Sequence, residues 1–374
     1  MCRKLFALLT ALFILMTVLP ANVYAAQVTG EAVLDKAGSF GDYEYTSDGS
    51  EVTITKYTGS GTKVTVPSEI DGLPVTEITG AFSWNTSVKN IVLPDSVTSI
   101  GGSAFFNCSA LQSVTLPEGL TSIGTEAFYY CTSLTSIRIP DKVTVIGWSA
   151  FQECSSLTNV KLPAGLKKLE FAEFRGCTGL TDITLPAGLK TIGEFTFADC
   201  TGLKSVSIPD SVTRITECAF VRCTSLKSMT IPSSVTYIGY GAVGCSSMEY
   251  NPETEKDEYV FDEEFKIYGK EGSAAEEYAE KYGIGFTAIT KAGWQKISGK
   301  WYYFNKNGVM VTGWKKISGK WYYFLSGGAM VTGWKKISGK WYWFSSGGVM
   351  FAGGTKTING KKYRFNSNGV CLNP

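Results

Sequence analysis

A repeat with a fixed period is the feature that most constrains how this chain folds. Seven copies of one motif begin every 23 residues, at Ile91, Val114, Ile137, Val160, Ile183, Val206 and Met229. A period of this length is typical of a solenoid, in which each unit buries a face against its neighbours that it could not bury alone. The sequence therefore predicts an elongated, stacked array.

The apolar positions within one copy predict its local structure. Val114 and Leu116 alternate as in a strand, and Pro117 ends that strand because it has no N–H to donate. Residues 120–123 form a second short extended segment. An Ala-Phe pair and a cysteine then fall on one face of a single helical turn. Each coil is thus predicted to hold two short strands and a tight helical turn around a shared core.

This pattern, L-x-x-[VI]-x-[IL]-P-x-x-[VL]-x-x-I-G-x-x-A-F-x-x-C, resembles the BspA-like leucine-rich repeats of bacterial surface proteins. Departures are few: Leu169-Glu170 and Ile215-Thr216 replace Ile-Gly, and Val243 replaces the phenylalanine. A degenerate copy precedes the set, so we predict leucine-rich repeats over residues 64–250. The resemblance implies adhesion to host matrix proteins or to other cells.

The cysteines follow the same period and predict packing. A small thiol is readily buried, so a ladder of thiols favours free side chains in the core, with pairing between neighbouring coils as the alternative. No Cys-x-x-Cys spacing exists, which argues against a zinc site. The residues at one repeat position are Cys108, Cys131, Cys154, Cys177, Cys200 and Cys223, with Cys245 displaced by one.

Residues 1–26 are predicted to be a secretory signal peptide. Arg3 and Lys4 form a basic start, residues 5–19 are apolar, and small residues at 25–26 suit cleavage. No second apolar stretch is long enough to span a membrane. We therefore expect a protein that is secreted and held at the bacterial cell surface or cell wall.

Segments that flank the array are predicted to cap it, because an uncovered solenoid end exposes core and strand edges. Residues 27–63 are expected to hold a β-hairpin whose turn lies at 47–50. Residues 250–258 are interpreted as a solvated acidic loop, within a linker and C-terminal α/β cap at 251–290. Ser273 and Glu276 form a capping-box pattern that opens a helix over 274–282, and Gly283 ends it.

Outward positions of the first strand of each coil are predicted to form a protein-binding face. Stacked coils turn them into rows of polar groups, the kind of extended surface that solenoids use for binding. Small polar residues also suit an exposed strand without any ligand. The positions are Thr115, Arg138, Lys161, Thr184, Ser207 and Thr230.

A second repeat, with a period of 20 residues, occupies 291–374. Gly-Trp recurs at 293–294, 313–314 and 333–334, and each copy continues as Lys-Ile-Ser-Gly-Lys-Trp-Tyr or a close variant. Ser-Gly between aromatic-rich segments predicts a β-hairpin, so the region is expected to be a β-hairpin solenoid. A fourth, weaker copy has Gly354 in place of tryptophan. These units resemble the choline-binding or cell-wall-binding repeats of Gram-positive surface proteins, and glucan-binding repeats look related.

The resemblance implies ligand sites between successive hairpins, built from aromatic residues of two repeats. Aromatic faces attract quaternary ammonium groups, and they also stack on sugar rings, so phosphocholine-bearing teichoic acid and glucan both remain candidate ligands. The absence of a matching tryptophan in the fourth unit argues against a third site. The implicated residues are Trp294 and Trp301 with Tyr322, Trp314 and Trp321 with Tyr342, and then Trp334 and Trp341.

Charge and composition favour a binding protein over an enzyme. Residues 291–374 carry 14 basic and no acidic side chains, whereas 27–290 carry 19 basic and 33 acidic ones. The basic tail suits an anionic wall polymer. The chain contains no histidine, which removes the usual general base and the commonest metal ligand. We predict no cofactor, no metal and no nucleic-acid partner. The alternatives are a glycan-binding protein in which both arrays bind carbohydrate, and an accessory of a wall hydrolase.

Overall fold

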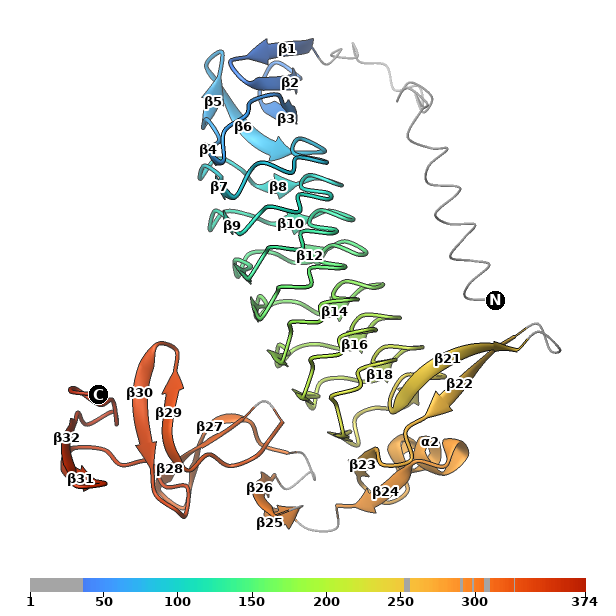
Figure 1. Cartoon of the computed structure of the whole chain (residues 1–374), viewed down its shortest axis with the longest axis vertical. Helices are drawn as coiled ribbons and strands as arrows, with labels where there is room; N and C mark the ends of the chain where they lie inside the picture. Colours follow the sequence, from blue (N-terminus) through green and yellow to red (C-terminus); the bar gives the residue numbers. More distant parts are fainter. Residues whose placement is uncertain (1–35, 252–255, 290–291, 298, 306–309, 326) are drawn as a thin grey trace.

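The computed structural model describes residues 36–251, 256–289, 292–297, 299–305, 310–325 and 327–374 (Figure 1). The predicted signal peptide lies outside these residues. Among them, no helix has the length and apolar character needed to cross a membrane.

The 23-residue repeats form a continuous solenoid of coils (Figure 1). Every coil contributes one short strand to each of two stacks of parallel strands. Neighbouring strands pair in parallel with a shift of one repeat, as Ile137 with Val160 and Ile192 with Ile215. The predicted solenoid is therefore confirmed. The first stack contains β4 (Lys63–Thr65), β7 (Asn90–Val92), β9 (Ser113–Thr115), β11 (Ser136–Arg138), β13 (Asn159–Lys161), β15 (Asp182–Thr184), β17 (Ser205–Ser207) and β19 (Ser228–Thr230).

The second stack contains the shorter strands that follow each proline. A tight turn then returns the chain to the next coil, and two residues of that turn are left-handed, such as Glu126 at φ 56° and Tyr130 at φ 60°. The strands are β6 (Leu73–Ile78), β8 (Ser99–Ile100), β10 (Ser122–Ile123), β12 (Val145–Ile146), β14 (Lys168–Leu169), β16 (Thr191–Ile192), β18 (Arg214–Ile215) and β20 (Tyr237–Ile238).

A ladder of phenylalanines forms the centre of the core. Each ring stacks on the same residue of the next coil, with centroids 4.9–5.7 Å apart and interplanar angles of 4–18°. Their repeated burial explains why the Ala-Phe motif recurs at a constant spacing. The ladder comprises Phe105, Phe128, Phe151, Phe174, Phe197 and Phe220, all with at most 2% of their surface exposed.

The cysteine ladder lies beside the phenylalanines and also links the coils. Each thiol donates a hydrogen bond to the phenylalanine carbonyl of the preceding coil, as Cys131 Sγ to Phe105 O at 3.2 Å and Cys154 Sγ to Phe128 O at 3.1 Å. All cysteines within the described residues are buried and none of them forms a disulfide there, as expected for thiols that pack in the core. Burial raises the pKa of Cys108 and of Cys154 to about 12.

At two of the Ile-Gly pairs, the close approach of successive coils requires glycine. A Cβ on Gly124 would lie 2.7 Å from the carbonyl carbon of Gly101, and one on Gly147 would lie 2.4 Å from the amide nitrogen of Thr125. Both distances are shorter than any normal contact, so a larger residue there would push the coils apart.

The N-terminal cap contains the predicted hairpin and one further strand. β2 (Tyr43–Ser47) and β3 (Val52–Tyr57) pair in antiparallel fashion, and β1 (Lys36–Phe40) adds to β2. β3 then pairs in parallel with β6, which continues the second stack, and β5 (Glu69–Ile70) pairs with β6. The hairpin thus covers the first coil.

The interpretation of residues 250–258 as a solvated acidic loop is wrong in part, because the described residues of this segment lie in two strands. β21 (Cys245–Asn251) pairs in antiparallel fashion with β22 (Lys256–Phe261). Apolar residues on this hairpin supply the stabilisation: the Phe261 ring stacks on Tyr282 at 4.8 Å, and the Tyr259 ring lies 4.3 Å from Tyr240. Packing of these rings outweighs the low strand propensity of the acidic residues.

The helix of the C-terminal cap, α2 (Ala274–Tyr282), has the predicted bounds, and Gly283 ends it with a φ of 67°. Neither hydrogen bond of the predicted capping box forms, and the Ser273 N–H donates to Lys270 O at 3.2 Å instead of to Glu276. The Ser273 side chain makes no capping hydrogen bond, whereas a Glu276 carboxylate oxygen accepts from the Gly272 N–H at 2.6 Å. β23 (Lys266–Gly269) and β24 (Gly285–Ala288) continue the first stack beyond β19.

Residues 293–365 form four antiparallel hairpins, as the 20-residue period predicts. Ser318 and Gly319 have φ values of 46° and 80°, which is the two-residue turn with both residues left-handed that matches the twist of a hairpin. The hairpins are β25 (Gly293–Ile297) with β26 (Lys300–Phe304), β27 (Gly313–Ile317) with β28 (Lys320–Phe324), β29 (Gly333–Ile337) with β30 (Lys340–Phe344), and β31 (Gly354–Ile358) with β32 (Lys361–Phe365).

Replacing Phe151 by alanine should destabilise the array strongly, because it removes a ring that stacks on both Phe128 and Phe174. We expect a loss of about 3–5 kcal/mol in the free energy of unfolding, measured by urea denaturation. Phe40→Ala, at a side chain that is 45% exposed, serves as the control and should change that free energy by less than about 0.5 kcal/mol. Equal effects of the two variants would contradict a central role for the ladder.

Alkaline pH should destabilise the array through its thiols. Burial raises the pKa of Cys154 from 9.0 to about 12, so folding favours the neutral thiol. This contribution to stability is complete below the unfolded value of 9.0 and is lost as the pH rises toward 12. We expect the urea midpoint to fall over that range, and to fall less in the Cys154→Ala variant. A variant whose midpoint fell as steeply as that of the parent protein would rule out this linkage.

Candidate functional site

Aromatic side chains of successive hairpins meet in corners that are open to solvent. The first corner joins Trp294 and Trp301, whose ring planes are nearly perpendicular at 87° with centroids 6.5 Å apart. Tyr322 of the next hairpin lies 4.9 Å from Trp294 and forms a third side. Trp301 remains 43% exposed, so a ligand can reach its face.

The second corner repeats this geometry. Trp314 and Trp321 lie 6.3 Å apart at 86°, and Tyr342 of the following hairpin lies 4.9 Å from Trp314. The structure therefore brings together both sets of three residues that the sequence analysis grouped.

A third corner also forms, although the missing tryptophan of the fourth unit had argued against a third site. Trp334 and Trp341 lie 6.3 Å apart at 85°, and Tyr363 lies 4.7 Å from Trp334. What the corner needs from the next hairpin is its tyrosine. Tyr363 follows Tyr342 by 21 residues, so the 20-residue period with a one-residue insertion was the signal that could have identified it.

Backbone hydrogen bonds hold consecutive hairpins in this register. The Met330 N–H donates to Trp301 O at 2.8 Å, Met350 donates to Trp321 O at 2.8 Å, and Cys371 donates to Trp341 O at 2.8 Å. The residue that follows each hairpin is thus bound to the exposed tryptophan of the hairpin before it. The three corners are parts of one regular framework.

A lysine lies directly across the strand pair from each exposed tryptophan. The partners in register are Lys296 with Trp301, Lys316 with Trp321, and Lys336 with Trp341. Residues opposite each other in an antiparallel pair share one face. Each corner can therefore present aromatic faces to a cation and a neighbouring ammonium to an anion.

Outward residues of the leucine-rich array form a row on the first stack, as expected from the pattern. Arg138 pairs in register with Lys161, and Thr184 with Ser207. The basic members of the row are partnered, because Arg138 forms an ion pair with Glu118 and Lys161 lies 3.6 Å from Asp141. Thr115, Arg138, Lys161 and Thr184 are exposed, whereas Ser207 and Thr230 are half-buried.

Hairpin residues cover the C-terminal end of that row. The Thr230 hydroxyl lies 3.6 Å from Met310 Sδ, and the Asn305 amide donates to Asp210 Oδ2 at 3.1 Å. Phe304 and Met310 also share an apolar cluster with Tyr268. The open part of the candidate face therefore lies toward Thr115, Arg138 and Lys161.

Comparison with known families agrees with both repeat regions. The model of the BspA type leucine-rich repeat region matches residues 77–172 and 149–266, which together span about half of the chain. The chain belongs to this family. Residues 291–332 and 331–370 match the model of the choline-binding repeat, so the two resemblances seen in the sequence are confirmed. No curated protein matches the chain.

Solved structures similar to this family member are of the same two kinds. A leucine-rich repeat protein of T. pallidum is 28% identical over 67% of this chain and 98% of its own, with a TM-score of 0.43. A leucine-rich cell surface protein of Faecalibacterium prausnitzii is 26% identical over 74% of this chain and 60% of its own, with a TM-score of 0.42. Choline-binding protein F of Streptococcus pneumoniae is 38% identical over 22% of this chain and 35% of its own, with a TM-score of 0.17.

Both matching families are repeat and binding modules. Among the residues that the structure describes, no cluster of cysteine and carboxylate side chains could hold a metal ion. The presence of both kinds of repeat in one chain supports a cell-surface binding protein.

Removing one corner should reduce choline binding without abolishing it. In Trp321→Ala, the corner of Trp314 and Tyr342 loses a face, and a cation–π contact contributes about 0.5–2 kcal/mol, or roughly 2- to 30-fold in affinity at that site. Titration calorimetry with choline should show fewer tight sites. Trp84→Ala, at a tryptophan of the array that is 67% exposed, is the control and should leave the titration unchanged. An unchanged titration for Trp321→Ala would contradict the assignment.

Proposed function

We propose that this protein is secreted, that its hairpin repeats tether it non-covalently to phosphocholine-bearing teichoic acid, and that its leucine-rich array presents an adhesion face. The single observation that carries the tether is the set of three solvent-open aromatic corners, each closed by a tyrosine of the next hairpin. Quaternary ammonium groups bind in such aromatic surroundings.

The charge of the hairpin region supports a ligand that carries both a positive and a negative group. Fourteen basic and no acidic side chains in 291–374 oppose a free cation but attract an anionic polymer. In phosphocholine, the ammonium would lie on the rings of Trp314 and Trp321 while the phosphate lies near Lys316. The phosphate of the ligand thus offsets the charge that would otherwise repel its choline group.

Glucan is the second candidate ligand, because the exposed tryptophan faces also suit sugar rings. Trp301, Trp321 and Trp341 are 43%, 43% and 37% exposed and follow one another along the hairpins. A glycan would use these faces without needing the adjacent lysines, whereas a wall phosphate would need them. This difference separates the two ligands experimentally.

The division of the chain follows from the same proposal. Residues 1–26 would be removed as a signal peptide, 27–63 and 251–290 would cap the leucine-rich repeats at 64–250, and 291–374 would bind the wall. The adhesion partner, a host matrix protein or another cell-surface protein, would contact the open end of the row at Thr115, Arg138 and Lys161.

The tether is tested by binding the full chain to purified cell walls whose teichoic acid carries phosphocholine. We expect choline to elute the protein, and we expect Lys316→Gln to weaken wall binding more than it weakens binding of free choline. Walls stripped of choline should retain little protein. Elution by glucan but not by choline would overturn the phosphocholine ligand and favour the glycan alternative.

A further inference from the structure

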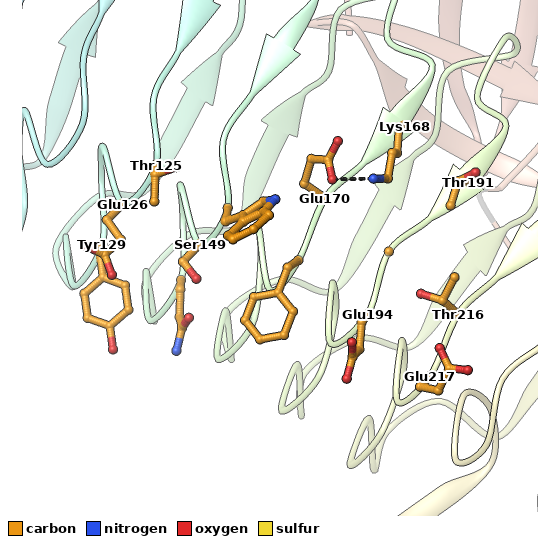
Figure 2. A pocket seen from close by; sticks show the side chains of 14 residues that line it. Thr125, Glu126, Tyr129, Ser149, Lys168, Glu170, Thr191, Glu194, Thr216 and Glu217 are labelled. Atoms are coloured by element: carbon orange, nitrogen blue, oxygen red, sulfur yellow. Dashed lines mark ion pairs between the residues drawn. The ribbon is translucent and has the colours of Figure 1, made fainter. Parts of the chain in front are cut away.

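A groove of about 540 Å³ lies along the turns that follow the strands of the second stack (Figure 2). The row of outward residues that begins with Thr115 and Arg138 lies on the first stack and is separate from this groove. Its volume falls in the range of ligand pockets. The groove crosses five coils, from the one that contains Thr125 to the one that contains Glu217. Neither the repeat pattern nor the proposed wall tether accounts for it.

Variable positions of the repeat supply its lining. Trp148, Phe171, Glu194 and Glu217 occupy the same place in successive coils, directly after the Ile-Gly pair or its replacement. The departures Glu170 and Thr216, which replace the glycine, also lie in the lining. The coils that depart from the repeat pattern therefore add side chains to the lining at a position where other coils have glycine.

Aromatic rings form one half of the groove. Trp148 is 58% exposed, and its ring meets Phe171 edge-on at 6.5 Å. Tyr129 stands at the far end from Glu217 (Figure 2). A tryptophan side chain that is exposed in this way often contributes strongly to binding of a partner protein.

Carboxylates line the groove from one end to the other, with Glu126 beside Tyr129 and Glu217 at the opposite end (Figure 2). The lining holds Glu126, Glu170, Glu194 and Glu217 against a single ammonium, that of Lys168, which lies 2.6 Å from Glu170. Burial, and then the adjacent Glu217, raise the pKa of Glu194, and burial raises the pKa of Glu126. Among the described residues, Glu194 accepts a hydrogen bond only at its backbone carbonyl, and its carboxylate has no ion-pair partner. Glu194 and Glu217 therefore repel each other in a partly desolvated place.

We propose that this groove binds an extended basic segment of a partner protein, with lysine or arginine side chains between the carboxylates and against the rings. A cation placed between Glu194 and Glu217 relieves their repulsion, which neutral sugar hydroxyls would not do. The faces of Trp148 and Tyr129 attract the same cationic groups. Anionic polymers such as teichoic acid are repelled, so this site and the hairpin corners select opposite kinds of partner.

Fluorescence anisotropy of labelled octalysine with the full chain tests the proposal. The variant Glu194→Gln/Glu217→Gln keeps the shape of both side chains, and it should weaken binding about tenfold. Its matched control, Glu263→Gln/Glu264→Gln, removes the same charge at two exposed residues outside the groove and should weaken binding less than about twofold. Trp148→Ala changes no charge and should weaken binding about fivefold.

Equal losses in the two glutamine pairs would mean diffuse attraction to an acidic array and would overturn the proposal. So would full binding by Trp148→Ala. Binding of neutral cellohexaose that is lost in Trp148→Ala and kept in Glu194→Gln/Glu217→Gln would make the groove a glycan site instead. These outcomes are independent of choline elution from walls, because no hairpin residue is changed.

Discussion

Contact between identical residues of successive coils is the interaction on which the whole structure depends. The phenylalanine rings stack, the cysteine thiols donate to the phenylalanine carbonyls of the coil before, and the glycine of Ile-Gly permits the backbones to approach. Each contact joins a residue to its counterpart, or to a neighbour of that counterpart, one repeat away. Equivalent surface residues of successive coils therefore lie next to one another at a fixed spacing. Rows of polar residues and grooves on the surface arise from this spacing alone.

The two repeats use this regularity for different surfaces. In the array, the repeated rings are buried, and the variable positions provide the chemistry of the groove. In the hairpins, one repeated ring stays exposed at the same place in each of the first three units, at Trp301, Trp321 and Trp341. The opposite charges of the two regions match the opposite partners proposed for them, and the contact of Asn305 with Asp210 places one region against the other.

Periodic features of this fold could be predicted from the sequence because equivalent residues of successive repeats contact each other. A pattern that recurs in the sequence therefore recurs as a contact in the structure. The buried thiols, the hairpin turns and the corners of Trp294 with Tyr322 and Trp314 with Tyr342 all belong to this class. Tyr363 was missed because the comparison of units relied on tryptophan. The hairpin at β21 and β22 was missed because its acidic residues obscured the apolar positions Tyr259 and Phe261.

Features that join distant segments had no such signal. Asn305 and Asp210 are 95 residues apart, and nothing in either period predicts that the hairpins cover Thr230 and Asp210. The groove was also missed, because its residues differ from coil to coil and look like noise in a repeat. Those differences, at Trp148, Glu170 and Glu194, are where the array departs from uniformity.

The thiol ladder has a consequence for how such a protein can mature and diversify. Because its sulfurs are satisfied by carbonyls of the adjacent turn, the array reaches its native state without forming disulfides. Duplication or deletion of a whole 23-residue unit also leaves no orphaned crosslink behind. The length of the array can thus change by gene rearrangement while the chemistry of every remaining turn stays the same.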